Sequence, residues 1–561
     1  MDSSDIDLNI VIAGAAGEGI QTIGSVLGEA LAAQGYAVFS WKEYESRIRG
    51  GHSSFSVRVQ AVLQNAPRTE ADIILAVNAG AAERYAPVLK DGGVLLGPES
   101  GADNTIVLPF ADMAEDLLGD RIYANTIAVG ALTATVGLEL EPLKEILSAR
   151  FKDKGEKIID ANHQAAAKGY AVAREECQDR CPWQLPTRNA RYYLIGTNEA
   201  ISLASAYAGC RFISAYPMTP STGVITNLAN RQPQLGVFAE QAEDELAAVN
   251  MAIGAAYGGA RAMTATSGGG FALMAEGISL AGMTETPLVI VLAQRPGPAT
   301  GLPTRTAQGD LLFAIHAGHG EFPKMVLAPS DPKDAFHSVV RAFNLADRYQ
   351  TPVIVLTDQL MADAQFSFSD LEAGQTGPEF ALADPAQISA YRRYQVTESG
   401  ISPRLYPGQS KHLVGADSDE HDERGHITED LPNTALAMAE KRRRKHQSLQ
   451  GEIRPPEETN LDDAETVFVS WGSSRNAVLE AVNRLRQDGT QVGMIHFTDL
   501  WPLPAYSFSK DKSYWSVEGN AGGQLARLLR SEYGLSFDRH LGRYDGLPLT
   551  ATYIRSYFNE R

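Results

Sequence analysis

Short apolar runs alternate with helical periodicity along most of the chain. The first run, Leu8 to Ala13, leads through a glycine-rich turn into apolar residues at helical spacing from Ile20 to Leu31. Later runs have the length and composition of strands, and they lie at 73–77, 93–96, 191–195, 212–215, 262–265, 288–292, 353–356, 466–470 and 492–496. Strands that alternate with helices predict parallel sheets covered by helices. We therefore expect an α/β fold.

The same pattern divides the chain into domains. With 561 residues, the chain is too long for one ordinary domain, and we predict three α/β domains at residues 1–185, 190–385 and 466–561. The segment 386–465 loses its apolar periodicity and is rich in charge, Pro and Gly. Such a long segment is unusual inside a compact domain, so we interpret it as a linker, a partner-wrapping arm or an active-site cover.

The chain is acidic, with a net charge of −19. A protein that follows a phosphate backbone needs a basic face to displace counterions, so the charge argues against nucleic acid and against anionic membranes. The N-terminus is acidic where a signal peptide is basic, and the longest apolar runs are too short to span a bilayer. We expect a cytoplasmic protein.

Three cysteines, Cys177, Cys181 and Cys210, limit the redox chemistry of the chain. A cluster held by four thiolates needs one more ligand, so this chain alone holds no iron–sulfur cluster. The spacing of Cys177 and Cys181 permits a metal site or a disulfide, but an acidic cytoplasmic chain usually keeps such thiols free. We expect free thiols and no metal site.

The first glycine turn places Gly14, Gly17 and Gly19 in the order G-x-x-G-x-G, which departs from the dinucleotide pattern G-x-G-x-x-G. Glycines at a strand-to-helix turn allow backbone N–H groups to face an anion. A phosphate-bearing ligand and a purely structural turn fit equally well, and coenzyme A fits as well as NAD. Arg49 and His52 flank a further glycine pair, where the alternatives are a ligand contact and a solvated basic turn.

Polar groups follow the strands of the second domain. In Tyr216-Pro-Met-Thr-Pro-Ser221, two prolines stiffen the turn and hold Thr219 at the carboxyl end of a strand, where open α/β sheets bind ligands. Acidic residues at 243–245 begin a helix whose Leu246, Val249 and Ile253 are expected on one apolar face. Such acids are usually dipole partners, but a carboxylate there can also pair with a heterocycle nitrogen in a cleft.

Two more glycine-rich turns follow later strands, at 264–271 and 294–305. Because successive parallel strands end at the same edge of a sheet, we expect these turns to cluster with the threonine turn. Arg295 offers a planar fork for a carboxylate, and Thr304 offers a hydroxyl nearby.

Two charged runs have simpler interpretations. The run 417–423 resembles a calcium loop, but Asp422 stands where glycine is needed and Thr428 where glutamate is needed, so a solvated acidic loop is expected. The basic run Lys441-Arg-Arg-Arg-Lys-His446 is expected to be a solvated helix face, with contact to an acidic partner as the alternative.

Taken together, these motifs resemble the α subunit of the 2-oxoacid:ferredoxin oxidoreductases. The resemblance rests on the turn at 216–220, the acidic helix start at 243–245, and the stretches 265–268, 294–310 and 319–321. Residues 14–24 and 43–52 resemble the family's γ subunit, fused ahead of α. Residues 471–473 and 518–524 resemble its transketolase-C-terminal-type domain. The resemblance implies γ-type, pyrimidine-type and transketolase-C-terminal-type domains.

The resemblance also implies residue roles. Thiamine diphosphate would carry the chemistry, with Glu243 paired to the pyrimidine N1′ and Asp244 and Glu245 as less favoured candidates. The implied cofactor contacts are Tyr216, Pro217, Gln241, Thr266, Ser267 and Gly268. The implied substrate contacts are Thr219, Arg295, Thr304, Arg49 and His52, and the implied coenzyme A contacts are Gly14, Gly17 and Gly19.

The sequence lacks the Gly-Asp-Gly motif with a following Asn that holds Mg²⁺ and the diphosphate in thiamine enzymes. The resemblance therefore implies a β subunit that supplies Mg²⁺, the diphosphate site and a [4Fe-4S] cluster, with ferredoxin as electron carrier and an (αβ)₂ assembly. The favoured reaction converts 2-oxoglutarate and coenzyme A into succinyl-CoA and CO₂, or the reverse. Pyruvate and branched-chain 2-oxoacids are alternative substrates, and a non-redox thiamine enzyme or a non-catalytic nucleotide-binding protein are alternative classes.

Overall fold

The computed structural model describes residues 6–46, 51–98, 104–178 and 180–560. These residues form three sheets in two compact units, each layered with helices. Unit 1 comprises residues 1–195, 363–370 and 550–552, and unit 2 comprises residues 196–362, 371–549 and 553–561. The α/β prediction is confirmed. Among the described helices, none combines the length and the apolar composition needed to cross a bilayer.

Unit 1 is built on a mixed sheet with strand order β6-β5-β4-β1-β3-β2-β14-β7. Its strands are β1 (Asp7–Ala15), β2 (Ala37–Tyr44), β3 (His52–Gln60), β4 (Ala71–Ala76), β5 (Leu89–Gly97), β6 (Thr105–Val107), β7 (Tyr193–Gly196) and β14 (Gln365–Phe368). Its helices are α1 (Ile20–Ala33), α2 (Ala79–Tyr85), α3 (Phe110–Leu118), α4 (Ala124–Thr135), α5 (Glu141–Arg150) and α6 (Glu156–Cys177), with 3-10 turns at 86–88, 121–123 and 152–154.

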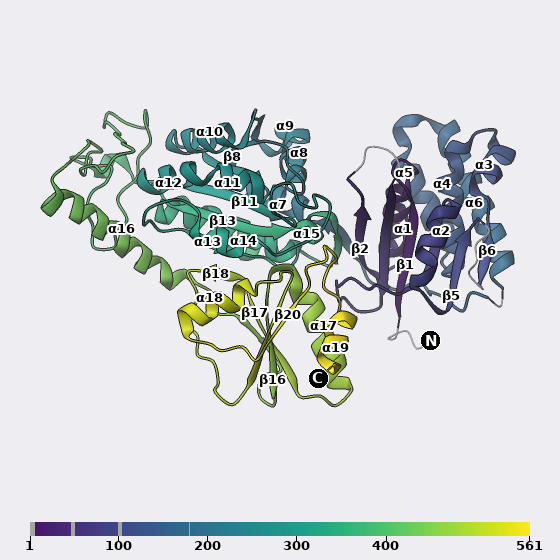
Figure 1. Cartoon of the computed structure of the whole chain (residues 1–561). Helices are drawn as coiled ribbons and strands as arrows, with labels where there is room; N and C mark the ends of the chain where they lie inside the picture. The colour runs from purple at the N-terminus through teal and green to yellow at the C-terminus, as the bar shows by residue number, and fades with distance from the viewer. Residues whose placement is uncertain (1–5, 47–50, 99–103, 179, 561) are drawn as a thin grey trace. The chain divides into compact units, whose positions relative to one another are not determined.

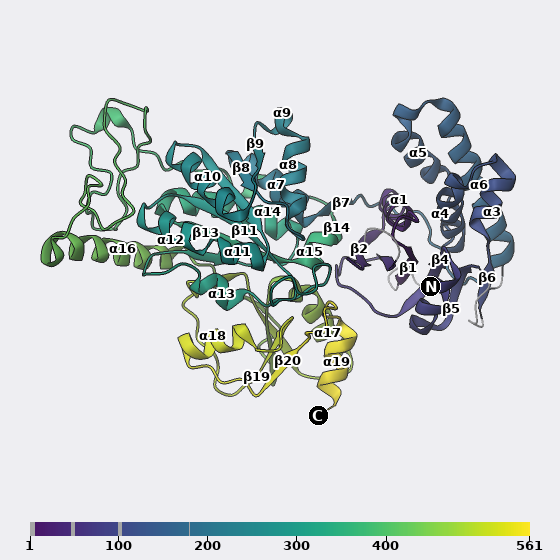
Figure 2. The same ribbon diagram turned by 45° about the horizontal axis from the view of Figure 1, so that its top comes forward.

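Helices cover both faces of this sheet at β1 and β4, which explains the unbroken apolar runs at 10–13 and 73–76. Ile10 and Ile12 of β1 join the core shared with α1 and α4, whereas Val11 and Ala13 join the core beside α2. Figure 2 shows α4 and α6 side by side. A Cβ added at Gly169 of α6 would lie 1.9 Å from the carbonyl oxygen of α4 residue Ile127, so glycine allows this close approach.

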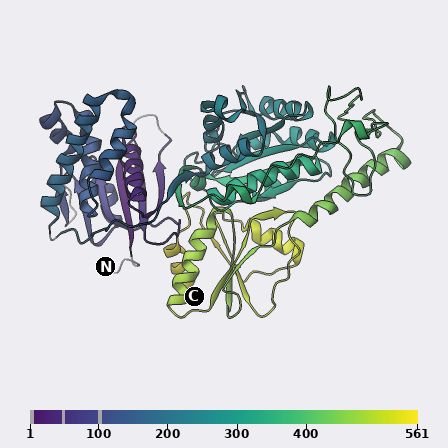
Figure 3. The same ribbon diagram turned by 180° about the vertical axis from the view of Figure 1, so that it is seen from behind.

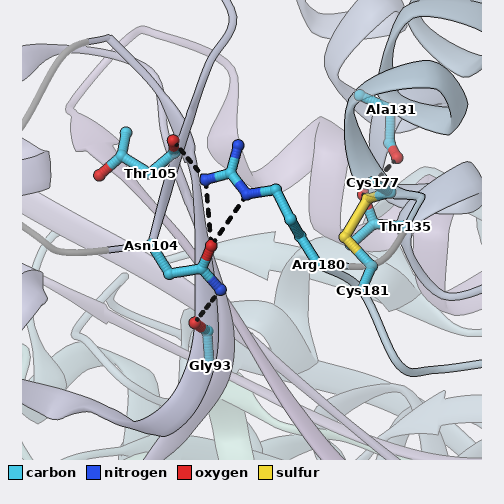
Figure 4. Close-up of a disulfide and its surroundings, with 8 residues drawn as sticks. All are labelled: Gly93, Asn104, Thr105, Ala131, Thr135, Cys177, Arg180 and Cys181. Carbon is cyan, nitrogen blue, oxygen red and sulfur yellow. Dashed lines mark hydrogen bonds between the residues drawn. A yellow bond between two sulfur atoms is a disulfide. The ribbon is translucent and has the colours of Figure 1, made fainter.

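The end of α6 corrects one expectation. Cys177 and Cys181 form a disulfide, as Figure 4 shows, so the expectation of free thiols is wrong for this pair. Between them, Arg180 donates hydrogen bonds to the side chain of Asn104 and to the carbonyl of Thr105 at the start of β6. The turn after α6 brings the two cysteines together, and both residues are buried. This local geometry was not considered in the prediction, which rested on the expected cellular compartment. Cys210 is free and buried.

Unit 2 contains two sheets, with orders β18-β12-β13-β11-β10-β8-β9 and β15-β17-β16-β19-β20. The central sheet contains β8 (Cys210–Ala215), β9 (Phe238–Gln241), β10 (Arg261–Thr266), β11 (Leu288–Gln294), β12 (Met325–Leu327), β13 (Pro352–Asp358) and β18 (Asp499–Trp501). Its helices are α7 (Thr197–Tyr207), α8 (Thr222–Asn230), α9 (Gln232–Leu235), α10 (Glu245–Tyr257), α11 (Gly268–Leu273), α12 (Ala275–Met283), α13 (Leu311–His316), α14 (Pro332–Tyr349) and α15 (Gln359–Asp363).

The five-stranded sheet lies in the C-terminal part of unit 2, which we call the C-terminal domain. Its strands are β15 (Glu457–Thr459), β16 (Thr466–Trp471), β17 (Val492–Phe497), β19 (Ser513–Glu518) and β20 (Arg539–Gly542). Its helices are α17 (Arg475–Gln487), α18 (Gln524–Tyr533) and α19 (Ala551–Asn559), with a 3-10 turn at 472–474. One strand from the same region, β18, pairs antiparallel with β12 and thereby joins the central sheet.

The strand β11 lies inside the central domain, with helices on both sides of its sheet (Figure 1). Leu288, Ile290 and Leu292 join the core that contains α10 and α12, whereas Val289 and Val291 join the core that contains α7, α8 and α14. Because both faces are covered, the strand is apolar without alternation. The loops at the strand ends are left to carry the polar groups.

The segment 386–465 packs within unit 2 and includes a long helix, α16 (Leu436–Leu449), with short helical turns at 431–435 and 450–452. Two further short turns, at 373–375 and 385–387, lie at or before its start. Figure 3 shows α16 extending from the irregular part of this segment toward the five-stranded sheet. Lys441 and Lys445 are buried and both contact the carboxylate of Glu285, while Arg442 pairs with Glu420. The expectation of a solvated helix face is therefore wrong for these three basic residues, because acidic partners meet them inside the fold.

Candidate active site

Three polar turns meet at one edge of the central sheet. The strands β8, β10 and β11 are parallel neighbours, so the turns at their carboxyl ends lie at the same edge. These turns carry Thr219 after β8, Ser267 after β10 and Arg295 after β11. The arrangement agrees with the clustering expected from the sequence.

A buried carboxylate begins α10 beside this edge. The side chain of Asp244 caps the helix by accepting the backbone N–H of Ala247 at 2.7 Å. Glu245, the first helical residue, is only 3% exposed, and its Oε1 atom has no hydrogen-bond partner among the described residues. Burial raises the pKa of the Glu245 carboxyl. Glu243, two residues earlier, is exposed.

The glycine turn after β10 is shaped around two carboxyl groups. A Cβ added at Gly270 would lie 2.4 Å from the Oε1 atom of Glu245, and one added at Gly268 would lie 2.6 Å from the Oδ2 atom of Asp310. Side chains at these positions would displace both acids. Ser267, between the strand and the first glycine, is fully buried, and no described residue hydrogen-bonds its hydroxyl.

Arg295 and Asp310 lie at the two ends of the loop that follows β11. The Arg295 guanidinium donates a hydrogen bond of 2.7 Å to the carbonyl oxygen of Thr219, which ties two of the three turns together. Gln294 accepts the backbone N–H of Asp310 at 2.9 Å and so closes the loop. Burial raises the pKa of Asp310 to about 6, although the nearby Arg295 charge acts in the opposite direction.

The structure therefore brings Thr219, Ser267 and Arg295 together, with Thr266 and Gly268 in the same turn as Ser267. Other predicted residues are more peripheral. Gln241 is exposed and Tyr216 is 40% exposed, while Pro217 and Thr304 are half-buried. None of these placements tests the assigned roles, which stay predictions.

Two residues that the structure highlights received little weight from the sequence. The resemblance ranked Glu245 below Glu243, and Leu246 was expected on the apolar face of α10, but Leu246 is 47% exposed. The buried face carries Glu245, Ala248 and Ala252 instead, so an alanine stripe was the available signal. Asp310 was only the end of a motif, and no pattern in the sequence indicated its burial.

The remaining predicted residues belong to unit 1. His52 opens β3 opposite Ala15, beside the glycine turn that contains Gly14, Gly17 and Gly19. Glu18 folds back over this turn and accepts the backbone N–H of Ala15 at 2.7 Å. Arg49 lies outside the described residues. In the described part of the chain, no group of three or more His, Cys, Asp or Glu side chains is arranged to hold a metal ion.

Comparisons with known proteins agree over almost the whole chain. Residues 204–441 match the family described as pyruvate flavodoxin/ferredoxin oxidoreductase, thiamine diP-binding, and residues 9–172 match pyruvate ferredoxin/flavodoxin oxidoreductase. The 2-oxoacid:ferredoxin oxidoreductase 2 subunit alpha of Aeropyrum pernix is 32% identical, over 97% of this chain and 96% of that protein. The 2-oxoglutarate oxidoreductase subunit KorA of Mycobacterium tuberculosis is 30% identical, over 94% and 87%.

A solved structure has the same fold. The 2-oxoglutarate:ferredoxin oxidoreductase from Magnetococcus marinus, with 2-oxoglutarate, coenzyme A and succinyl-CoA bound, superimposes with a TM-score of 0.91 at 32% sequence identity. The match covers 99% of each chain. The sheet edge that carries Glu245 and Asp310 therefore belongs to a fold whose solved relative has 2-oxoglutarate bound.

Proposed function

Because the chain belongs to the α subunits of the 2-oxoacid:ferredoxin oxidoreductases, we propose that it catalyses the coenzyme A-dependent oxidative decarboxylation of 2-oxoglutarate to succinyl-CoA and CO₂, or the reverse reaction. Two observations support this substrate: relatives named 2-oxoglutarate synthase or oxidoreductase subunit KorA, and the ligands of the structural neighbour. Pyruvate and branched-chain 2-oxoacids remain the alternatives.

The buried acid of α10 fits a thiamine site. When bound, thiamine diphosphate supplies the nucleophilic carbon and stabilises the negative charge left after CO₂ departs. A carboxyl oxygen that is desolvated and unpaired can accept a hydrogen bond from a heterocycle nitrogen, and that pairing grows stronger as water is excluded. Glu245 has both properties, because its Oε1 atom is buried without a partner in the described chain. We therefore assign to Glu245 the pyrimidine N1′ contact that sequence reasoning assigned to Glu243.

The neighbouring turn would hold the 2-oxoacid. Arg295 is directed by its hydrogen bond to the Thr219 carbonyl, and a guanidinium binds a carboxylate through a charge-assisted fork. The hydroxyls of Thr219 and Thr304 would orient the reacting carbonyl and shape the specificity. Arg49 and His52 remain candidates for the second carboxylate of 2-oxoglutarate.

A partner subunit would complete the site. Large apolar side chains are exposed on helices that adjoin it, with Leu246 and Met251 on α10, Leu273 on α11 and Phe313 on α13. Exposed apolar groups gathered around a site favour a protein interface. We propose that a β subunit covers them and supplies Mg²⁺, the diphosphate anchor and a [4Fe-4S] cluster that passes electrons to ferredoxin, in an (αβ)₂ assembly.

Coenzyme A would meet the glycine turn of unit 1. Gly17 and Gly19 have positive φ angles of 96° and 77°, and a Cβ at Gly17 would meet nothing within 4 Å. The N–H of Ala15 is already bonded to Glu18. A Cβ at Gly14 would lie 2.4 Å from Val77, and one at Gly19 would lie 2.0 Å from Asn125. We therefore expect the phosphate contact at Gly17, the open position of the turn.

The experiment that tests the proposed chemistry compares Glu245→Gln with Glu243→Gln in the assembled enzyme. Loss of a proton-transferring carboxyl typically costs about 10² to 10⁴ in rate, so Glu245→Gln should lower kcat by at least about 100-fold. Glu243→Gln, which changes an exposed acid, should retain kcat within about twofold. Full turnover by Glu245→Gln would overturn the assignment.

A second measurement decides the substrate. The reconstituted complex is supplied with coenzyme A and an electron acceptor, and acceptor reduction is followed with 2-oxoglutarate, pyruvate and a branched-chain 2-oxoacid. We expect the highest kcat/KM for 2-oxoglutarate. No response to 2-oxoglutarate, with turnover of another acid, would reject the substrate and keep the family.

A further inference from the structure

The C-terminal domain meets the substrate loop at one buried glutamine. Gln308 lies two residues before Asp310 in the loop that follows β11, and it is 3% exposed. Its side-chain Nε2 donates a hydrogen bond of 2.8 Å to the carbonyl of Trp471, and its Oε1 accepts the N–H of Gly519 at 2.8 Å.

The backbone of the same residue is bonded to the same domain. The N–H of Gln308 donates to the carbonyl of Gly519 at 2.8 Å, and its carbonyl accepts the side-chain amide of Asn520 at 2.9 Å. All four polar groups of Gln308 are therefore satisfied by the C-terminal domain. Such complete matching in a buried position defines one geometry, because any displacement leaves several groups unpaired.

The residues that bind Gln308 are themselves held by hydrogen bonds within the C-terminal domain. Glu518 is fully buried and accepts hydrogen bonds from the Trp471 indole, from Asn520 and from the backbone N–H groups of Leu525 and Ala526. A Cβ added at Gly519 would lie 3.2 Å from Cγ of Gln308, a tight contact that glycine avoids.

Further hydrogen bonds join the C-terminal domain to other residues of the loop. Gln524 donates to the carbonyl of Gly309 at 2.6 Å and accepts the N–H of Leu312 at 3.0 Å. Earlier in the loop, the N–H of Thr306 donates to the carbonyl of Gly546 at 3.2 Å. The loop that presents Arg295 and Asp310 is thus fixed on the C-terminal side as well as by the central sheet.

We propose that Gln308 is a positioning residue through which the C-terminal domain fixes the 294–310 loop and thereby the Arg295 contact to the 2-oxoacid. This inference rests on the proposed function. It gives a role to the Trp471-Gly-Ser and Glu518-Gly-Asn motifs, which contribute no group to the acids of the site but hold the loop that carries one of them.

The test replaces Gln308 with methionine, which keeps the length and much of the volume of the side chain but cannot make its hydrogen bonds. In the assembled enzyme, KM for the 2-oxoacid should rise by about tenfold or more, since small misplacements of a binding group cost up to about 10² in efficiency. The kcat value should fall by less than about threefold, and the affinity for thiamine diphosphate, measured by titrating the apoenzyme, should change by less than about twofold.

Asp499→Asn is the matched control. Asp499 joins the same two domains through its ion pair with Arg341 on α14, but it does not touch the 294–310 loop. This variant should be less stable, with KM within about twofold of the wild type. Should Gln308→Met fail to fold, Gly519→Ala, which keeps Gln308 but crowds it, should raise KM in the same selective way.

The possible outcomes distinguish failure of the proposed function from failure of the positioning role of Gln308. If the wild-type complex shows no 2-oxoacid-dependent acceptor reduction, the proposed function fails. If the wild type is active and Gln308→Met keeps the wild-type KM, the positioning role is wrong. Equal losses in 2-oxoacid and thiamine affinity would also contradict it, because they would indicate general damage to the domain.

Discussion

Two groups of buried acids in the central domain have opposite surroundings. Glu285 is 1% exposed and contacts the ammonium groups of Lys441 and Lys445 on α16. These cations hold the pKa of its carboxyl well below the ordinary range, against the effect of burial. The buried carboxylate and the two cations thus tie the segment 386–465 to the domain.

At the edge of the sheet, Glu245 has no such partner, and Asp310 has only the nearby charge of Arg295. Glu245 and Asp310 each keep a buried oxygen that accepts no hydrogen bond from any described residue, and burial raises the pKa of both carboxyls. An unpaired buried acid destabilises the fold. The contrast supports the proposal that the acids at the sheet edge serve a ligand, whereas the paired Glu285 serves the structure.

The largest test of this contrast is Glu285→Gln. Removing the charge leaves two ammonium groups buried without an anion, and breaking a buried ion pair from one side typically costs about 3–5 kcal/mol. We expect a loss of that size in the unfolding free energy of the chain, measured by urea denaturation at pH 7. If Glu285 serves the structure alone, any variant that folds should keep KM for the 2-oxoacid within about twofold.

The effect of Glu285→Gln on stability should also depend on pH, in a direction that the pairing predicts. Because the folded pKa of Glu285 lies below its ordinary value of 4.5, its stabilisation is present above that value and is lost as pH falls below it. The difference in unfolding free energy between wild type and Glu285→Gln should therefore shrink in acid. A difference that grows as pH falls would contradict the pairing.

The layered fold could be predicted because its signals are local. The run 288–292 is apolar throughout since both of its faces are covered, and the turns at 216–221 and 264–271 follow directly from their prolines and glycines. The acid proposed for the pyrimidine contact, Glu245, could not be chosen in the same way. The Ser214 hydroxyl of β8 donates to the Ala248 carbonyl of α10 at 2.5 Å, so the helix and strand approach closely. The buried side of α10 includes the small residues Ala248 and Ala252, whereas Leu246 is exposed.

The basic run on α16 shows what the sequence could not predict, namely ion pairs between residues that lie far apart along the chain. Lys441 meets Glu285 across 156 positions of sequence, and no local pattern reveals an ion pair over that separation. Gln308 likewise finds its partners 163 and 211 positions later. Periodicity and turn chemistry therefore predict the elements and the edge of the sheet, but not which polar groups are paired once those elements pack.

A smaller effect of opposite sign is expected for Glu245→Gln. Because burial raises the pKa of Glu245 above its ordinary value of 4.5, the folded state holds a proton more tightly than the unfolded chain, and stability falls as pH rises through the folded pKa. Removing the ionisable group should raise the unfolding free energy at pH 8 by an amount on the order of 1 kcal/mol. The gain should vanish near pH 4, and urea denaturation at both pH values measures it. A loss of stability at pH 8 would mean that Glu245 has a structural partner.

The smallest effect concerns Asp310, and it appears in substrate affinity. Below its pKa of about 6, Asp310 is neutral and leaves the Arg295 charge available, whereas above that pH its carboxylate competes with the 2-oxoacid for the guanidinium. The wild-type KM should therefore rise through pH 6, by about threefold if the two nearby charges interact as weakly as an exposed ion pair does. Asp310→Asn should flatten this rise and lower KM at pH 8, whereas Glu243→Gln should keep it, because Glu243 is an exposed acid outside the loop. Steady-state kinetics from pH 5 to 8 with the assembled enzyme give both profiles. If KM rises with pH as steeply in Asp310→Asn as in the wild type, Asp310 does not compete for Arg295. Glu245 would then be the one acid of the two that acts on a ligand.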